Sequence, residues 1–175
     1  VIFIFALAIF DLTVGVSNDA VNFLNSAIGS KAASFKAIIA IASIGVFAGA
    51  SMSNGMMDIA RHGMFNPQYF EFQELMYLFM AVIVTDIILL DTFNSLGLPT
   101  STTVSMVFEL LGATCCIAMI KVFSGNTDIP FADHINTDKA LTVILGIFIS
   151  VAIAFFFGSI VQWISRLIFT FKYKR

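Results

Sequence analysis

Long apolar stretches are the feature of this sequence that most constrains its fold. They run over Ala37–Met57, Leu75–Phe93, Ser101–Phe123 and Ala140–Ser165, and two further apolar pieces lie within Val1–Ile28. A helix needs about 20 apolar residues to cross the hydrocarbon core of a bilayer. With 59% hydrophobic and only 11% charged residues, the chain lacks the charged surface of a soluble domain. The sequence therefore predicts an all-α membrane protein in which residues 1–175 form a single transmembrane domain.

Charge, cysteine and histidine usage exclude several other classes. The formal net charge of −2 is spread along the chain, so no nucleic-acid partner is expected. Cys115 and Cys116 are adjacent in an apolar run, and we interpret them as small apolar residues. His62 and His134 have no partner at metal-ligand spacing, so we expect them to be solvated and expect no zinc site. The chain starts at Val1 inside an apolar stretch, which we interpret as a truncated start.

The placement of basic residues predicts the orientation in the membrane. Lysines and arginines gather on the cytoplasmic side of short membrane loops. The basic end Lys172–Arg175 follows the last apolar stretch, so we expect this end to be cytoplasmic in the plasma (inner) membrane. Loops Ser124–Asp138 and Phe65–Glu74 then lie outside, and Lys31 and Lys36 fall on the cytoplasmic side, in agreement with the rule.

A polar stretch, Ser17–Asn25, interrupts the first apolar region. Its Asn18, Asp19 and Asn22 offer amide and carboxylate oxygens suited to a hard cation, and Gly15 would let the helix unwind so that carbonyls join them. This pattern predicts a broken first helix with a cation or substrate site. The alternative is a helix N-cap at the membrane edge, although a cap needs only one such residue.

A second polar stretch, Asp91–Thr103, separates two apolar segments that are too close for an ordinary loop. It reads as the tip of a re-entrant helical hairpin, with Pro99 near the first turn of a new helix whose free N–H groups point at an anion. The candidate phosphate ligands are the hydroxyl and amide side chains of the tip: Asn94, Ser95, Thr100, Ser101, Thr102 and Thr103. The alternative is a Ser/Thr-capped turn at the membrane surface.

Acidic residues inside the apolar segments form a third group. A charge in hydrocarbon costs at least about 2.5 kcal/mol, so Asp86, Asp91 and Glu109 are expected to face protein or water. Glu109 lies about two helical turns after Thr102 and therefore on the same face. Asp91 and Glu109 are possible coupling or structural acids, since each could carry a proton or merely pair with a buried donor. Asp11 is either a second cation ligand or a solvated acid.

At this point the motifs resemble a known family. Ser17–Asn22, with the trailing Ile28–Ala32, resembles the Ala-Asn-Asp-Val-Ala-Asn signature of the inorganic phosphate transporter (PiT) family. Leu98–Thr103 resembles that family's Leu-Pro-Val-Ser-Thr-Thr segment, and Gly55–Gly63, with an acid at Asp58 and a base at Arg61, is similar to an intervening family motif. The resemblance covers roughly 13–113, and the three motifs appear in family order.

The resemblance implies a carrier of two inverted repeats, of which this chain is the first. Each repeat contributes one Asn-Asp motif and one Ser-Thr-Thr tip to a shared site. Asp19 would be a ligand of sodium, if the carrier is sodium-coupled, with Asn18, Asn22 and Thr102 completing the cation position. Ser101, Thr102 and Thr103 would line the phosphate position. Val104 stands where many members carry His.

The function expected is symport of inorganic phosphate with sodium or a proton by alternating access. A second repeat or another copy of the chain, possibly in a homodimer, would complete the site. The alternatives are a channel or structural membrane subunit, or a carrier of another oxyanion such as sulfate. No cofactor is expected, and no enzyme activity, because the Ser-rich tip lacks a nearby His base and no Gly-Lys-Ser/Thr motif follows it.

Overall fold

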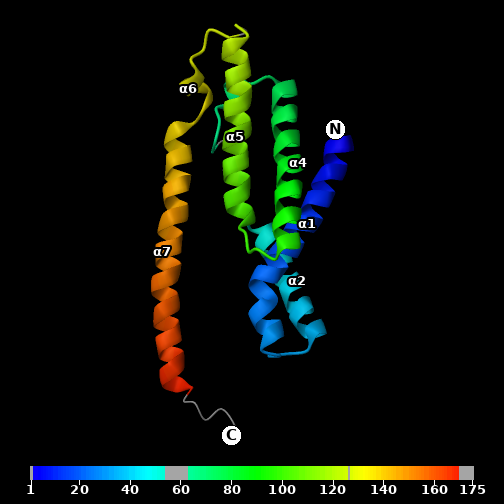
Figure 1. Cartoon of the computed structure of the whole chain (residues 1–175), viewed down its shortest axis with the longest axis vertical. Coiled ribbons are helices and arrows are strands. Elements are labelled where there is room, and N and C mark those ends of the chain that lie inside the picture. Colours follow the sequence, from blue (N-terminus) through cyan, green and yellow to red (C-terminus); the bar gives the residue numbers. More distant parts are fainter. Residues whose placement is uncertain (1, 54–62, 126, 170–175) are drawn as a thin grey trace. The chain divides into compact units, whose positions relative to one another are not determined.

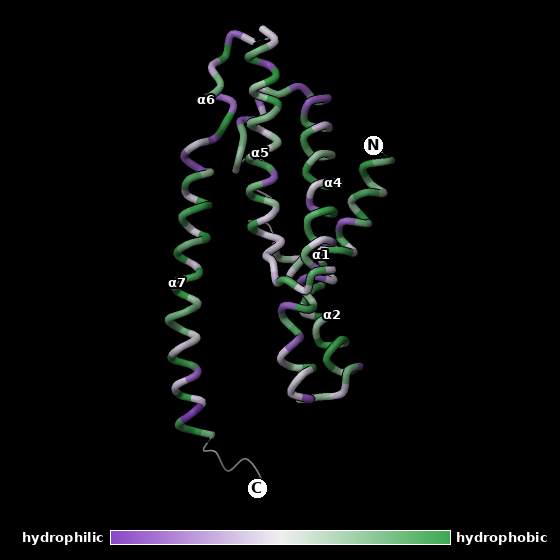
Figure 2. The backbone as a smooth tube through the Cα atoms, viewed as in Figure 1, coloured by the Kyte–Doolittle hydropathy of each residue, from purple (hydrophilic) through white to green (hydrophobic). Residues whose placement is uncertain are grey.

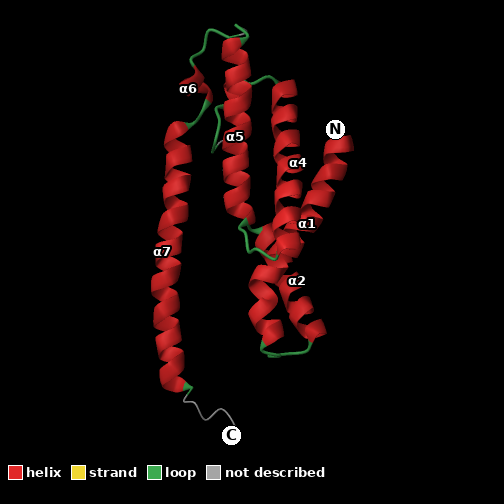
Figure 3. Cartoon of the chain, viewed as in Figure 1, coloured by secondary structure: helices red, strands yellow, loops and turns green. Residues whose placement is uncertain are grey.

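The computed structural model describes residues 2–53, 63–125 and 127–169, and over these ranges the chain forms helices joined by loops, with no strand (Figures 1 and 3). The elements are α1 (Ile2–Gly29), α2 (Phe35–Ser51), the 3-10 helix η1 (Pro67–Tyr69), α4 (Phe72–Leu96), α5 (Thr102–Phe123), α6 (Phe131–His134) and α7 (Thr137–Ile168). Helices α1, α4, α5 and α7 are long and apolar enough to cross a membrane (Figure 2). The prediction of an all-α, multi-pass membrane protein is confirmed.

The chain divides into two compact units, residues 1–137 and 138–175. In the first unit, α4 and α5 pack against each other as a helical hairpin, and α1 packs against both of them and against α2. The second unit consists of α7, a helix whose side chains are almost all exposed, as suits contact with lipid or with another apolar surface.

Helix α1 is continuous from Ile2 to Gly29, so the structure does not show the predicted break at the polar stretch. The physical reason is that the polar side chains at the middle of α1 find partners on the neighbouring hairpin. The backbone therefore keeps its own hydrogen bonds and does not need to unwind to satisfy them. Gly15 permits an irregular backbone but does not require one. Helix α1 also contains no proline that would break its backbone hydrogen bonds.

Helix α2 is shorter than the predicted segment. It begins after Ser34, whose hydroxyl accepts a hydrogen bond from the N–H of Ala37 (3.4 Å), and it ends at Ser51. Met52 and Ser53 follow the helix as a turn, and residues 54–57 of that segment lie outside the described residues, as do Asp58, Arg61 and His62 of the intervening motif region. The basic end Lys172–Arg175 also lies outside them.

The hairpin tip is built by local backbone chemistry. Gly97 ends α4 with φ of +67°, a left-handed conformation that glycine adopts without steric cost. The N–H of Leu98 returns to the carbonyl of Phe93 (3.0 Å), and Pro99 then keeps the chain extended. Ser101 caps α5, because its hydroxyl accepts a hydrogen bond from the N–H of Val104 (3.4 Å). The chain therefore reverses direction within a few residues.

At the opposite end of the hairpin, two loops pack on each other around His134. The N–H of Asn66 donates to the carbonyl of His134 (3.1 Å), and Phe65 pairs with Ile135 in an isolated bridge. His134 is completely buried and its ring lies against Phe70. The expectation that His134 is solvated is wrong, because the two loops fold over it.

Candidate functional site

The tip of the α4–α5 hairpin meets the middle of α1, and polar side chains from all three helices meet there. Asn18 of α1 is only 2% exposed, and its amide nitrogen donates to the amide oxygen of Asn94 at the end of α4 (2.8 Å). A buried amide is costly unless it is hydrogen-bonded, so this pair fixes the position of α4 against α1.

Asn22 extends the same network by one helical turn. Its amide nitrogen lies 3.1 Å from the amide oxygen of Asn18 and 2.8 Å from the backbone carbonyl of Thr100. The two asparagines face the hairpin together because residues four apart share one side of a helix. The bond to Thr100 attaches the loop of the tip, and not only its helices, to α1.

Asp19 lies beside Thr102, the first residue of α5. The Thr102 hydroxyl is 3.3 Å from Oδ1 and 3.4 Å from Oδ2 of Asp19, distances at the long end of the range for a hydrogen bond. One hydroxyl hydrogen is shared between two carboxylate oxygens, so the carboxylate retains free lone pairs. The structure therefore brings the predicted cation group of Asn18, Asp19, Asn22 and Thr102 into one place.

The predicted phosphate group is brought together less completely. Asn94 and Thr100 join the network on α1, whereas Ser95, Ser101 and Thr103 are exposed at the tip. The Ser101 hydroxyl serves as the N-cap of α5, as the capped-turn alternative requires. That alternative does not account for Thr102, whose hydroxyl contacts another helix.

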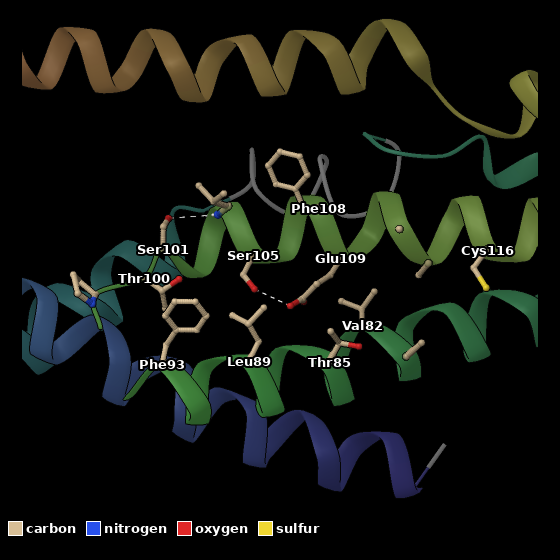
Figure 4. Close-up of a pocket in the computed structure, with 15 residues that line it drawn as sticks. Val82, Thr85, Leu89, Phe93, Thr100, Ser101, Ser105, Phe108, Glu109 and Cys116 are labelled. Atoms are coloured by element: carbon tan, nitrogen blue, oxygen red, sulfur yellow. Dashed lines mark hydrogen bonds between the residues drawn. The ribbon is translucent and has the colours of Figure 1, made fainter. Parts of the chain in front are cut away.

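A groove of about 780 Å3 between α4 and α5 opens beside the tip (Figure 4). Phe93, Leu89 and Phe108 give it apolar walls, and Thr100 and Ser101 lie at its end. Figure 4 shows Ser105 and Glu109 side by side along this groove, joined by a hydrogen bond. Hydroxyl and carboxylate groups are therefore present in an otherwise apolar space.

A second polar group lies along the hairpin, away from the tip. The Ser105 hydroxyl contacts both Glu109 (2.7 Å) and Asp86 (2.9 Å), and Asp11 of α1 lines the same cavity as Asp86. We refer to Asp11, Asp86, Ser105 and Glu109 as the carboxylate cluster. The Oδ1 atom of Asp11 is buried, whereas the residue as a whole is partly exposed.

Sequence reasoning missed Ser105 and assigned no role to Asp86. The available signal was the spacing of Ser105 and Glu109, which are four residues apart and therefore neighbours on one helix face. Asp91, in contrast, is exposed on α4. It lies five residues from Asp86, which places the two acids on different faces of the helix.

Comparison with known families gives one match. A family model described as the phosphate transporter family matches residues 15–175. The matched range includes the polar stretch of α1 and the whole hairpin. Searches of curated proteins and of solved structures found no match.

Proposed function

Because the chain belongs to the phosphate transporter family, we propose that it carries inorganic phosphate across a membrane together with a sodium ion or a proton. The observation that carries this proposal is the contact between Thr102 and Asp19. It puts a helix N-terminus, which suits an anion, directly beside a carboxylate, which suits a cation.

Phosphate would bind at the first turn of α5. The backbone N–H groups there have no intrahelical partner, apart from the one that Ser101 caps, and the helix dipole favours an anion. The side chains of Ser101, Thr102 and Thr103 add neutral donors, and Asn94, Ser95 and Thr100 flank them. Neutral donors bind a phosphate oxygen without the strong charge that would prevent its release.

The cation would bind at Asp19, with oxygen atoms of Asn18, Asn22 and Thr102 around it. Without a cation, the Asp19 carboxylate would repel a phosphate at the adjoining tip, and this repulsion is strong where water is scarce. A bound cation removes the repulsion, so it raises the affinity for phosphate. By linkage, phosphate raises the affinity for the cation by the same factor. Coupling then follows from the short distance between the two positions.

The geometry of α1 supports a re-entrant hairpin. At 1.5 Å per residue α1 is about 42 Å long, and Asn18 to Asn22 lie about 10 to 17 Å from its end at Gly29. The hydrocarbon core is about 30 Å thick. If α1 crosses it, the tip that contacts these residues lies within the membrane and not at its surface. A site at that depth is suited to exposure first on one side and then on the other, as alternating access requires.

The remaining half of the site would come from an inverted second repeat or from another copy of the chain. The hairpin tip has room for such a partner, since Ser101 and Thr103 are exposed. We propose a cytoplasmic position for the C-terminal end of the chain, in the plasma (inner) membrane, on the charge distribution given above.

The test is uptake of radiolabelled phosphate by the protein reconstituted in liposomes, under a sodium gradient, a proton gradient and no gradient. We expect accumulation above the external concentration under one of the two gradients and none without them. Equilibration without accumulation would contradict symport and identify a channel. Competition by excess sulfate as strong as that by unlabelled phosphate would contradict the proposed substrate.

A further inference from the structure

The carboxylate cluster brings together one acid from each of the three packed helices. Asp11 comes from α1, Asp86 from α4 and Glu109 from α5, and both Asp11 and Asp86 interact electrostatically with Glu109. Ser105, which is 8% exposed, lies between Asp86 and Glu109. Acids inside a membrane segment are costly and must be neutralised or solvated.

Counting hydrogens shows what the cluster lacks. The Ser105 hydroxyl lies 2.9 Å from Oδ1 of Asp86 and 2.7 Å from Oε1 of Glu109, so both contacts are within hydrogen-bond distance. A hydroxyl has one hydrogen, and an ionised carboxylate has none. A single hydrogen shared between the two oxygen atoms would bond each of them weakly. Contacts as short as 2.7 and 2.9 Å are better satisfied when one of the two carboxyl groups carries a proton and donates it to Ser105.

Two further oxygen atoms show that the cluster has too few hydrogen-bond donors. Oδ1 of Asp11 and Oε2 of Glu109 are buried and have no hydrogen-bond partner. Lys121, on the same helix as Glu109, is about 18 Å further along it and pairs with Glu74 (2.8 Å). An unpaired buried carboxylate oxygen is costly, and a bound proton lowers that cost.

The position of the acids favours a proton over a metal ion. The described residues include no group of three acid, His or Cys side chains placed to hold a metal. Nevertheless, a cavity of about 290 Å3 reaches the cluster. Its lining includes Asp11 and Asp86 of the cluster together with Thr102 and Thr103 of the hairpin tip. Water in this cavity would give a proton a path between the cluster and the tip.

We propose that Asp11, Asp86, Ser105 and Glu109 form a proton-binding site, separate from the cation position at Asp19. A carboxylate oxygen of the cluster forms an O–H bond to a proton delivered by a hydronium ion in the cavity beside Thr102, whose own O–H bond breaks to leave water. The reverse transfer later returns the proton to water. The role of this proton in phosphate transport rests on the proposed function, whereas the presence of the proton does not.

The first experiment measures the proton itself, by infrared spectroscopy of the protein in liposomes at neutral pH. We expect a carbonyl band of protonated carboxyl groups that is lost in Asp86→Asn and in Glu109→Gln. The loss is expected because the new amide nitrogen in each variant can donate a hydrogen bond to Ser105, so no carboxyl group needs to carry a proton. Asp128→Asn, which removes an exposed loop acid, leaves the band unchanged. Absence of the band, its persistence in both variants, or its removal by sodium would overturn the proposal.

The second experiment separates this site from the phosphate site. We expect Glu109→Gln to lose phosphate accumulation driven by a proton gradient but to retain exchange of labelled for unlabelled phosphate at equal concentrations. Full accumulation by Glu109→Gln would overturn the proton site. Absence of exchange in the unsubstituted protein would instead overturn the proposed function. If Glu109→Gln loses exchange and the unsubstituted protein retains it, the infrared band of the unsubstituted protein tests the proton-binding site. Presence of the band supports the site, and its absence overturns it.

Discussion

Polar side chains at the contact between α1 and the hairpin tip differ from those on α7 in what they bond to. On α7, the hydroxyls of Thr142, Ser150 and Ser159 each donate to a carbonyl of their own helix, three or four residues earlier. At the tip, Asn18 and Thr102 bond to side chains of other helices. Side chains whose hydrogen bonds go to their own helix are tolerated anywhere in a membrane helix. Side chains that depend on another helix create a defined site.

The largest effect that separates the two regions is expected from Asp19→Asn. The variant removes the charge that would hold the cation and keeps the size of the side chain. A charge-assisted contact is worth about 1.5 to 3 kcal/mol, so we expect cation-driven phosphate uptake to fall by about 10- to 100-fold. Ser150→Ala on α7 is the matched control and should keep normal uptake. Uptake that is equal in the two variants would remove the distinction between the regions.

A smaller effect is expected on stability from Asn18→Ala. The variant removes the hydrogen-bond donor to the amide oxygen of Asn94 and one acceptor for the amide nitrogen of Asn22. We expect the free energy of unfolding to fall by about 1 to 3 kcal/mol. Ser159→Ala removes only a hydroxyl that bonds its own helix, and we expect a change within about 0.5 kcal/mol. Thermal unfolding of the detergent-solubilised protein measures both. Similar melting temperatures would show that the α1–α4 contact contributes little.

The turn of the hairpin gives a third, smaller effect. Gly97 adopts φ of +67°, so Gly97→Ala should destabilise the tip by about 1 to 2 kcal/mol. Gly97→Asn should cost less, because asparagine tolerates the left-handed region. Since the proposed phosphate position lies at the tip, we expect a raised KM for uptake in the alanine variant, with the asparagine variant between it and the unsubstituted protein. An alanine variant with unchanged KM would mean that the turn does not position the site.

The smallest effect is expected far from the tip, at Lys121. Its ammonium bonds to Glu74 (2.8 Å) and to the carbonyl of Tyr69 (2.9 Å), and it is partly exposed. Lys121→Met should lower the free energy of unfolding by about 1 kcal/mol. Phosphate KM should be unchanged, because this pair lies at the opposite end of the hairpin from Thr102. A changed KM would show that the outer loops are coupled to the site.

Much of the fold follows from the sequence because apolar length alone predicts membrane helices. Helices α4, α5 and α7 lie where the apolar segments predict them. The continuity of α1 could not be predicted, because it depends on whether Asn18 and Asp19 bond to another helix or to an unwound backbone. Ser105 was missed for the same reason. A serine in an apolar helix usually bonds its own helix, and only the fold shows that this one lies between Asp86 and Glu109.

The most direct test of the account is equilibrium binding of radiolabelled phosphate to the protein at increasing sodium concentration and at decreasing pH. If a cation at Asp19 offsets the repulsion between this carboxylate and phosphate at the tip, phosphate affinity rises with one of the two cations. In Asp19→Asn that dependence is lost, since the amide carries no charge to neutralise. Phosphate affinity that is independent of both cations in the unsubstituted protein, or equally dependent in the variant, would contradict the account.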